Sequence, residues 1–324
     1  MTNDVELGRS VEARLTKAAI GESVRAVSTL VQAAFALRGA LADLEVTRDQ
    51  PYGADPAQRY DIWRAPAVSR TARPLVLFLH GGGFQQLDRA SHWSFAERFA
   101  RAGAVVINAD YRLAPQHAYP RAADDAARVC EHVLERAEAL GADPRQLVVA
   151  GVSAGANLAL GLAITRAAST HAPRACVLFS GLLQVSDMAR LYRSRSVARP
   201  LRARMASIGC DYLPQAAALS PARPDPRLDP LLYLEQCAEL PLEFAATFIS
   251  TGSRDQLLED ALRLRNCLVE RGAEPALDVV SGAGHAFQGF ILRAGVRAVW
   301  QRCFAFLERA GLQLASARSS GAAS

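Results

Sequence analysis

The stretch VVAGVSAGANLALGLA, residues 148–163, joins an apolar run to a helical pattern through a serine flanked by two glycines. The run before Gly151 is typical of a buried strand, and the alanine- and leucine-rich run after Gly155 is typical of a helix. Ser153 therefore lies at a strand-to-helix turn that matches the pattern G-x-S-x-G. Glycines remove the Cβ atoms that would collide in so sharp a turn, so the spacing predicts a serine hydroxyl that projects at the end of a strand.

The rest of the chain alternates strand-like and helix-like segments around this turn. Strands are predicted from short apolar runs at residues 59–66, 74–80, 104–112, 145–151, 174–183, 242–252 and 276–282. Helices are predicted from apolar periodicity at residues 92–103, 122–141, 155–168, 256–272 and 289–310. This alternation favours right-handed βαβ units, so we predict an α/β fold with a mostly parallel sheet flanked by helices.

Two segments depart from this alternation. Residues 1 to 45 show the apolar stripe of a helix, and residues 184–239 are rich in arginine, proline and short helical pieces. We expect both to form a cap over one end of the sheet, although the second segment can also be read as a surface excursion without function. The predicted division is 1–48 as the N-terminal helical part of the cap, 49–183 as the first part of the core, 184–240 as the cap insertion, 241–312 as the second part of the core and 313–324 as a disordered tail.

Composition and charge exclude several classes of function. Of 324 residues, 50% are hydrophobic and 21% charged, and the net charge of +5 is spread along the chain, which argues against a nucleic-acid partner. Six cysteines lie far apart without CxxC or metal-ligand spacing, so we predict reduced thiols, no bound metal and a cytoplasmic location. The N-terminal residues lack the apolar region of a secretory signal, and no window reaches the ~18 apolar residues that span a bilayer.

A serine hydroxyl needs an adjacent base to act as a nucleophile, and the chain offers one at a strand end. His285 lies in the small-residue loop SGAGHAFQGF, after the strand predicted at 276–282. Asp255 follows the strand predicted at 242–252 and would orient the imidazole. Glu259 and Asp260 are alternatives for this carboxylate, but both fall inside a predicted helix. The order serine, acid, histidine is the one used on this type of sheet.

Acyl transfer also needs hydrogen-bond donors for the oxyanion, and LHGGGF at residues 79–84 is placed to supply them. The amides of Gly82 and Gly83, together with that of Ala154 after the serine, are the predicted oxyanion hole. The triple glycine lacks the spacing of a P-loop or a dinucleotide-binding loop, so a phosphate site is the weaker interpretation.

Several segments together resemble the hormone-sensitive-lipase-like family of α/β-hydrolase esterases. They are HGGGF at 80–84, DYRLAPQHAYPRAADD at 110–125 and GVSAGANLA at 151–159, followed in order by Asp255 and His285. The resemblance implies an eight-stranded, mostly parallel sheet with a helical cap, hydrolysis of carboxylic esters without a cofactor, and a homodimer paired through the last strand. The chain departs from the family pattern at four positions, which are Gln86, Gln116, Val152 and Ala286.

The sequence therefore predicts a serine carboxylesterase that acts on short- to medium-chain esters through an acyl-enzyme, with a small-molecule ester as its partner. Phe84, Gln85 and Val152 are predicted to line the substrate pocket, and Tyr111 and Arg112 to brace the glycine loop. A lactonase, an amidase or formamidase, or a metabolite-tailoring hydrolase would use the same triad. A non-catalytic ligand receptor on this fold is a further alternative, which the presence of His285 disfavours.

The arginines between residues 193 and 204 admit two interpretations. They attract an acidic acyl group, or they form a solvated helix face.

Overall fold

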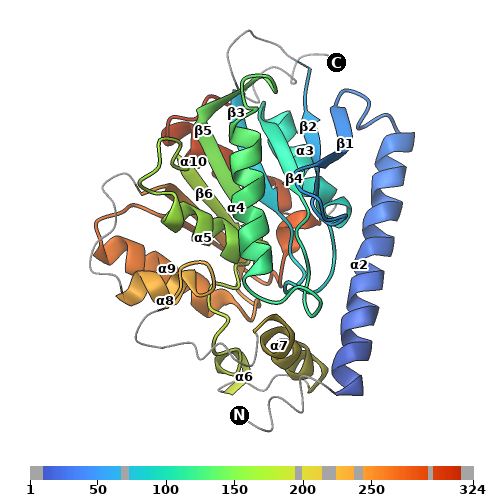
Figure 1. Cartoon of the computed structure of the whole chain (residues 1–324), viewed down its shortest axis with the longest axis vertical. Helices are drawn as coiled ribbons and strands as arrows, with labels where there is room; N and C mark the ends of the chain where they lie inside the picture. Colours follow the sequence, from blue (N-terminus) through green and yellow to red (C-terminus); the bar gives the residue numbers. More distant parts are fainter. Residues whose placement is uncertain are drawn as a thin grey trace.

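The core of the protein is a sheet whose strands are β1 (Glu45–Pro51), β2 (Arg59–Arg64), β3 (Arg73–Leu79), β4 (Val105–Ala109), β5 (Ala142–Val152), β6 (Ala175–Phe179), β7 (Ala246–Gly252) and β8 (Ala276–Val280). The structure is a computed structural model that describes residues 10–66, 73–193, 199–213, 224–236, 244–290 and 295–314. The eight strands lie in the order β1-β2-β4-β3-β5-β6-β7-β8 (Figure 1). The β1–β2 and β2–β4 pairs are antiparallel, and every other pair is parallel.

Both faces of this sheet are covered, because alternate residues of each central strand enter different apolar clusters. On β3, Leu75, Leu77 and Leu79 pack into one cluster, and Val76 and Phe78 pack into the other. The first cluster is completed by α4 (Arg121–Leu134), α5 (Ala154–Thr165), α8 (Pro230–Gln236) and α9 (Leu258–Glu270). The second is completed by α3 (Trp93–Arg101) and α10 (Val296–Arg309). Burial on both faces explains why these strands are apolar without alternation.

The predicted α/β fold with an eight-stranded, mostly parallel sheet is confirmed, but one strand escaped prediction. The seven predicted strands correspond to β2 to β8, whereas β1 begins at Glu45, inside the range 1–48 that we assigned to the cap. Strand β1 is a mostly exposed edge strand with the sequence EVTRDQP, so it carries neither an apolar run nor an apolar alternation. The last helix also begins later than expected, at Val296, after a short 3-10 turn, η2 (Phe287–Gly289).

Helices from two distant parts of the chain pack together beside the carboxyl ends of the parallel strands. They are α2 (Val11–Leu37) and α7 (Arg199–Tyr212), and α2 also contacts η1 (Ala90–His92), the turn that precedes α3 (Figure 1). Lys17 of α2 pairs with Asp211 of α7 at 3.6 Å. The short helix α6 (Arg190–Arg193) lies near α7 in Figure 1. The first predicted cap segment thus reaches the second.

The helix α8, which we placed in the cap insertion, packs instead on α5 and α9 beside the sheet. Residues 194–198, 214–223 and 237–240 of the predicted insertion lie outside the described residues, as do residues 1–9 and residues 315–324 of the predicted tail. The division into cap and core therefore stays a prediction. Within the described part of the chain, no helix combines the length and the apolar character needed to cross a membrane.

A buried ion pair fixes the segment that follows β4 to the start of α4. The Arg112 guanidinium donates from Nε at 2.8 Å and from NH2 at 2.7 Å to the carboxylate of Asp125, which has no exposed surface. The Arg112 amide and the Gln58 side chain donate to the same carboxylate at 2.9 and 2.7 Å. Arg112 thus holds its chain neighbour Tyr111 in place. Contrary to our prediction, it makes no hydrogen bond to the glycine loop among the described residues.

We expect Arg112→Ala to lower the free energy of unfolding by about 3 kcal/mol, because it leaves a buried carboxylate with only two neutral donors. Urea denaturation monitored by tryptophan fluorescence measures the change. Arg136→Ala, which removes an exposed pair with Glu135, is the matched control and should change stability little. An Arg112→Ala protein that is as stable as the wild type would contradict the assigned role of this pair.

Candidate active site

Ser153 occupies a strained turn between β5 and α5. Its φ of 55° and ψ of −116° lie outside the regions that most side chains adopt, and its amide donates to the Phe179 carbonyl at 2.9 Å. A Cβ atom on Gly155 would lie 2.0 Å from the carbonyl oxygen of Leu79, and one on Gly151 would lie 2.2 Å from that of Gly155. Only glycine fits at either position, so the serine side chain is raised above the end of the sheet.

His285 and Asp255 complete a hydrogen-bonded array with this serine. The distance from His285 Nε2 to Ser153 Oγ is 3.1 Å, and the distances from His285 Nδ1 to the two carboxylate oxygens of Asp255 are 3.0 and 3.1 Å. The three residues follow β5, β7 and β8, whose carboxyl ends meet at one edge because the strands are parallel. The structure thus brings together the three side chains that the sequence selected.

The environment of Asp255 favours its charged form. Burial alone would raise the pKa of this carboxyl, but the charge and hydrogen bond of His285 and the Leu257 amide outweigh burial and lower the pKa below its usual value. The two alternative acids lie elsewhere. Glu259 is exposed, and Asp260 is buried in an ion pair with Arg190, at 2.7 Å. Asp255 is therefore the carboxylate that can orient the imidazole.

The loop that carries His285 is held by buried polar side chains that the sequence did not mark. The Gln288 side chain donates to the carbonyl and the hydroxyl oxygen of Ser250, on β7, at 2.9 and 3.1 Å. Ser180, which follows β6, accepts a hydrogen bond from the Ala286 amide at 3.1 Å. These contacts tie Ala286 and Gln288, in the loop after β8, to Ser180 and to β7, and so limit the positions that the imidazole can adopt.

The glycine loop after β3 presents two free amides beside Ser153. The Gly81 amide is used, because it donates to Nε2 of His92 at 3.2 Å. The amides of Gly82 and Gly83, whose φ values of 122° and 65° favour glycine, have no acceptor among the described residues, and the Ala154 amide has none there either. A Cβ on Gly82 would lie 1.8 Å from the Gln86 carbonyl oxygen. The three free amides are the ones predicted for the oxyanion hole.

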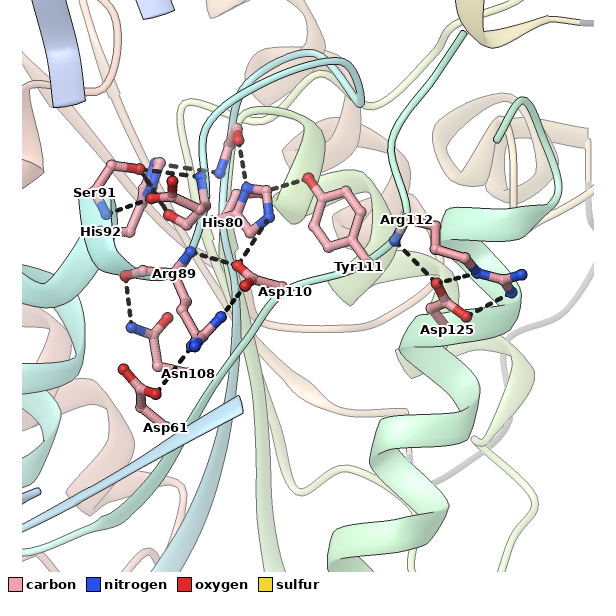
Figure 2. A network of polar contacts seen from close by, with 12 residues as sticks. Asp61, His80, Arg89, Ser91, His92, Asn108, Asp110, Tyr111, Arg112 and Asp125 are labelled. Atoms are coloured by element: carbon pink, nitrogen blue, oxygen red, sulfur yellow. Dashed lines mark hydrogen bonds and ion pairs between the residues drawn. The ribbon is translucent and has the colours of Figure 1, made fainter. Parts of the chain in front are cut away.

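Two buried histidines hold this loop by the peptide groups of Gly81. His80 Nδ1 donates to the Gly81 carbonyl at 2.7 Å, while His92 accepts from the Gly81 amide (Figure 2). Burial lowers the pKa of His80 to about 4 and, together with the nearby His80, that of His92 to about 3. Both imidazoles are therefore neutral at neutral pH, which matches the acceptor role of His92.

Tyr111 supports the loop from the side of β4. Its ring stacks on that of His80 with centroids 4.2 Å apart, and its hydroxyl donates to the His80 carbonyl at 2.8 Å (Figure 2). Next to it, the Asp110 carboxylate accepts from the Arg89 amide at 2.6 Å and binds the Arg89 guanidinium. Arg89 also donates to Asp61 of β2 at 2.9 Å. The contacts link the loop to β4 and β2.

A cavity of about 580 Å³ opens beside Ser153 and His285. Its walls are mostly apolar and come from α2, α7 and the segments that carry the array, with side chains such as those of Val24, Val27, Met205 and Ile208. The positions of α2 and α7 therefore decide its size.

Two of the three predicted pocket residues do not line this cavity. Phe84 is fully buried and stacks on Tyr212 of α7 with ring centroids 3.9 Å apart, so it supports the wall from behind. Gln85 is turned toward α7, where its side chain donates to the Ser207 carbonyl at 2.6 Å. Val152 does line the cavity, and so does Gln86. The prediction was wrong for Phe84 and Gln85 because the loop turns their side chains away from the serine.

The most informative residue missed as part of the site is Arg204, because we read it only as one arginine of the 193–204 cluster. Arg199 and Arg202 are exposed, and Arg195 and the side chain of Arg193 lie outside the described residues. Arg204, in contrast, is only 6% exposed and lines the cavity. The sequence distinguishes Arg204 from the other arginines of this cluster only by its place on α7, where the adjacent residues Ala203 and Met205 are also buried. His92 was also missed, because no sequence spacing predicts its contact with the Gly81 amide.

Comparison with known proteins agrees with this geometry. A family model for the α/β-hydrolase fold matches residues 76–289. The chain belongs to the hormone-sensitive-lipase-like family of α/β-hydrolases. The matched residues include the glycine loop, Ser153, Asp255 and His285, and they begin after α2.

Three relatives illustrate the similarity. An ethyl acetate hydrolase from Pseudomonas putida is 34% identical over 68% of this chain and 67% of its own length. Esterase LipU from Mycobacterium tuberculosis is 31% identical over 67% of this chain and 71% of its own length. The crystal structure of esterase LipW from Mycobacterium marinum is 28% identical, with a TM-score of 0.68, over 91% of this chain and 88% of that one. Two further curated mycobacterial esterases match over only 36% and 30% of their own length.

The close contact at Gly155 gives a first test of the site. We expect Gly155→Ala to abolish catalytic activity and to lower the melting temperature, because the added Cβ would overlap the Leu79 carbonyl oxygen and push α5 away from β3. Differential scanning calorimetry and an ester assay measure both effects. Gly284→Ala is the control, since its Cβ would meet no heavy atom within 4 Å. Normal activity in Gly155→Ala would contradict the geometry of the turn.

The pKa of His92 gives a second test. An unfolded histidine binds its proton near pH 6.5, whereas folded His92 stays neutral down to a pH of about 3. Below pH 6.5 the unfolded chain therefore binds one more proton at this residue. The residue's contribution to the free energy of unfolding then falls by about 1.4 kcal/mol for each unit that the pH decreases.

We expect His92→Gln, which keeps an acceptor for the Gly81 amide, to lose about 1.4 kcal/mol per pH unit of this dependence between pH 6 and 4. Denaturant titrations at several pH values measure the slope. Asp110, whose pKa is raised by burial to about 6, titrates in the same range and changes stability with the opposite sign. Because Asp110 is present in both proteins, the difference between their slopes isolates His92. Parallel slopes in the two proteins would show that His92 is protonated in the folded state.

Proposed function

We propose that this protein is a serine carboxylesterase that hydrolyses short- to medium-chain carboxylic esters through an acyl-enzyme. The observation that carries the proposal is the hydrogen-bonded array of Ser153, His285 and Asp255, which faces three amides that have no acceptor in the described part of the chain. The names of the relatives, which include an ethyl acetate hydrolase and several esterases, support the same reaction. They do not favour a lactonase, an amidase or formamidase, or a tailoring hydrolase.

In the proposed mechanism, Ser153 Oγ attacks the ester carbonyl while His285 Nε2 takes its proton. The negative charge that develops on the carbonyl oxygen is stabilised by the amides of Gly82, Gly83 and Ala154. His285, held by Asp255, then gives the proton to the departing alkoxide. Water activated by the same imidazole attacks the acyl-enzyme and releases the acid, with the proton returning to Ser153. A receptor without catalysis has no use for the contact between His285 and Ser153, and we do not favour it.

The size and lining of the cavity support the proposed range of substrates. A volume of about 580 Å³ with mostly apolar walls suits an acyl chain of a few carbons together with a small alcohol. Because most of the lining is apolar, the walls select by size more than by hydrogen bonding. The proposal retains the cytoplasmic location, which is supported by four buried cysteines that form no disulfide among the described residues, Cys130, Cys176, Cys267 and Cys303. The homodimer implied by the family remains a prediction.

A panel of p-nitrophenyl esters from acetate to palmitate tests this function. We expect turnover from acetate to octanoate, preceded by a burst equal to the enzyme concentration, and a steep loss at palmitate because the cavity cannot hold the chain. Ser153→Ala should lower kcat by about 10⁴-fold or more and abolish labelling by a fluorophosphonate. Ser169→Ala, in the turn after α5, is the control and should behave as the wild type. No turnover of any ester from acetate to octanoate would refute the proposal.

A further inference from the structure

A buried cation from α7 lies against the outer side of the glycine loop. The Arg204 guanidinium donates from NH2 to the Gly82 carbonyl oxygen at 3.0 Å and from NH1 to the Gln85 side-chain oxygen. Arg204 is 6% exposed, and no carboxylate of the described residues lies within ion-pair distance. The acid whose charge raises its pKa is Asp211, which pairs with Lys17. Burying a guanidinium without a direct counter-ion costs free energy of folding, which suggests that Arg204 has a functional role.

The Gly82 carbonyl belongs to the same peptide group as the Gly83 amide. A donor at the carbonyl end of a peptide polarises it and makes its N–H a stronger donor, by about 10–30% per hydrogen bond. A fixed positive charge nearby also stabilises negative charge in a water-poor site. The pKa of Arg204 is lowered by burial to about 10, so the guanidinium remains charged at neutral pH. Arg204 can therefore strengthen the amide that faces the oxyanion.

The other two amides of the oxyanion hole have the same arrangement. The Gly82 amide shares its peptide with the Gly81 carbonyl, which accepts from His80 Nδ1 at 2.7 Å. The Ala154 amide shares its peptide with the Ser153 carbonyl, which accepts from the Leu182 amide at 3.1 Å. The Gly82 carbonyl also accepts from the Gln85 amide, and the Ser153 carbonyl also accepts from two amides of α5. Among all the donors to these three carbonyls in the described residues, only Arg204 carries a charge, and only Arg204 comes from a helix that packs on α2.

We propose that Arg204 is a positioning residue that holds and polarises the Gly82–Gly83 peptide, so that the oxyanion hole reaches full strength only when α7 is docked over the site. The inference rests on the proposed esterase function and adds to it a residue outside the triad and the hole. Because the hole acts on the transition state, Arg204 contributes to kcat rather than to KM. Docking of α7, which also closes the cavity, is thereby coupled to the rate of the chemical step.

Two substitutions separate the parts of this role. Arg204→Gln keeps a neutral donor without the charge, and Arg204→Lys keeps the charge with a single point of donation. We expect Arg204→Gln to lower kcat for p-nitrophenyl butyrate about tenfold, less than the loss of a complete donor, with KM within twofold of the wild type. Arg204→Lys should recover most of the rate. Affinity for a butyl trifluoromethyl ketone, which forms a tetrahedral adduct with Ser153, should fall with kcat.

All rates are expressed per active site titrated with a fluorophosphonate, so that unfolded protein does not count. Arg190→Met is the matched control. It breaks the buried pair with Asp260 in the same stretch between β6 and β7, and it should lower the melting temperature without changing kcat per titrated site. A merely structural role for Arg204 would give this same pattern in Arg204→Gln and would overturn the inference.

A comparison of two substrates tests the remaining explanation. If Arg204 binds a carboxylate of the substrate, the loss in Arg204→Gln will be confined to a mono-ester of succinate and absent with the neutral butyrate ester, which overturns the inference. An equal loss on both esters supports it. Failure of the proposed function is distinguishable, because it would appear in the wild type as absence of both ester turnover and Ser153 labelling, and it would remove this inference with it.

Discussion

The close approach of Gly155, at the start of α5, to the carbonyl of Leu79, at the end of β3, is the contact on which the other features of the site depend. It brings the turn after β5 against the glycine loop that follows β3. Ser153 and the free amides of Gly82 and Gly83 therefore lie side by side, which an additional methyl group on residue 155 would prevent. The strain in Ser153 is tolerated because the end of β5 and the start of α5 are buried and hold the turn from either side.

Around this contact the protein uses buried polar groups to fix peptide orientation. His80 and His92 hold the two sides of Gly81, and Gln288 with Ser250 holds the loop of His285. The atoms that make these hydrogen bonds are paired at defined distances, so rotation of a loop would leave a buried donor or acceptor unpaired. The orientation of the catalytic groups is thus maintained by the cost of breaking hydrogen bonds away from water, rather than by the loops themselves.

The helices α2 and α7 give the site its limited volume. They come from distant parts of the sequence, pair through Lys17 and Asp211, and supply apolar walls to the cavity. Because α7 also carries Arg204, the same helix shapes the cavity and contacts the glycine loop. The core contains the array of Ser153, His285 and Asp255, whereas the volume of the cavity depends on these two helices.

The sequence by itself determined the parallel sheet, the strand-to-helix turn at Ser153 and the order of the triad, because these follow from short-range patterns of apolar runs and glycines. It also selected Asp255 over Glu259 and Asp260 by its place at a strand end. It could not reveal β1, whose exposed edge carries no apolar pattern, nor could it show that Phe84 and Gln85 turn away from the cavity. The contacts of His92 with Gly81 and of Arg204 with Gly82 join residues that no spacing rule connects. Only tertiary packing decides them, since the free energy of a buried polar group depends on partners from distant parts of the chain.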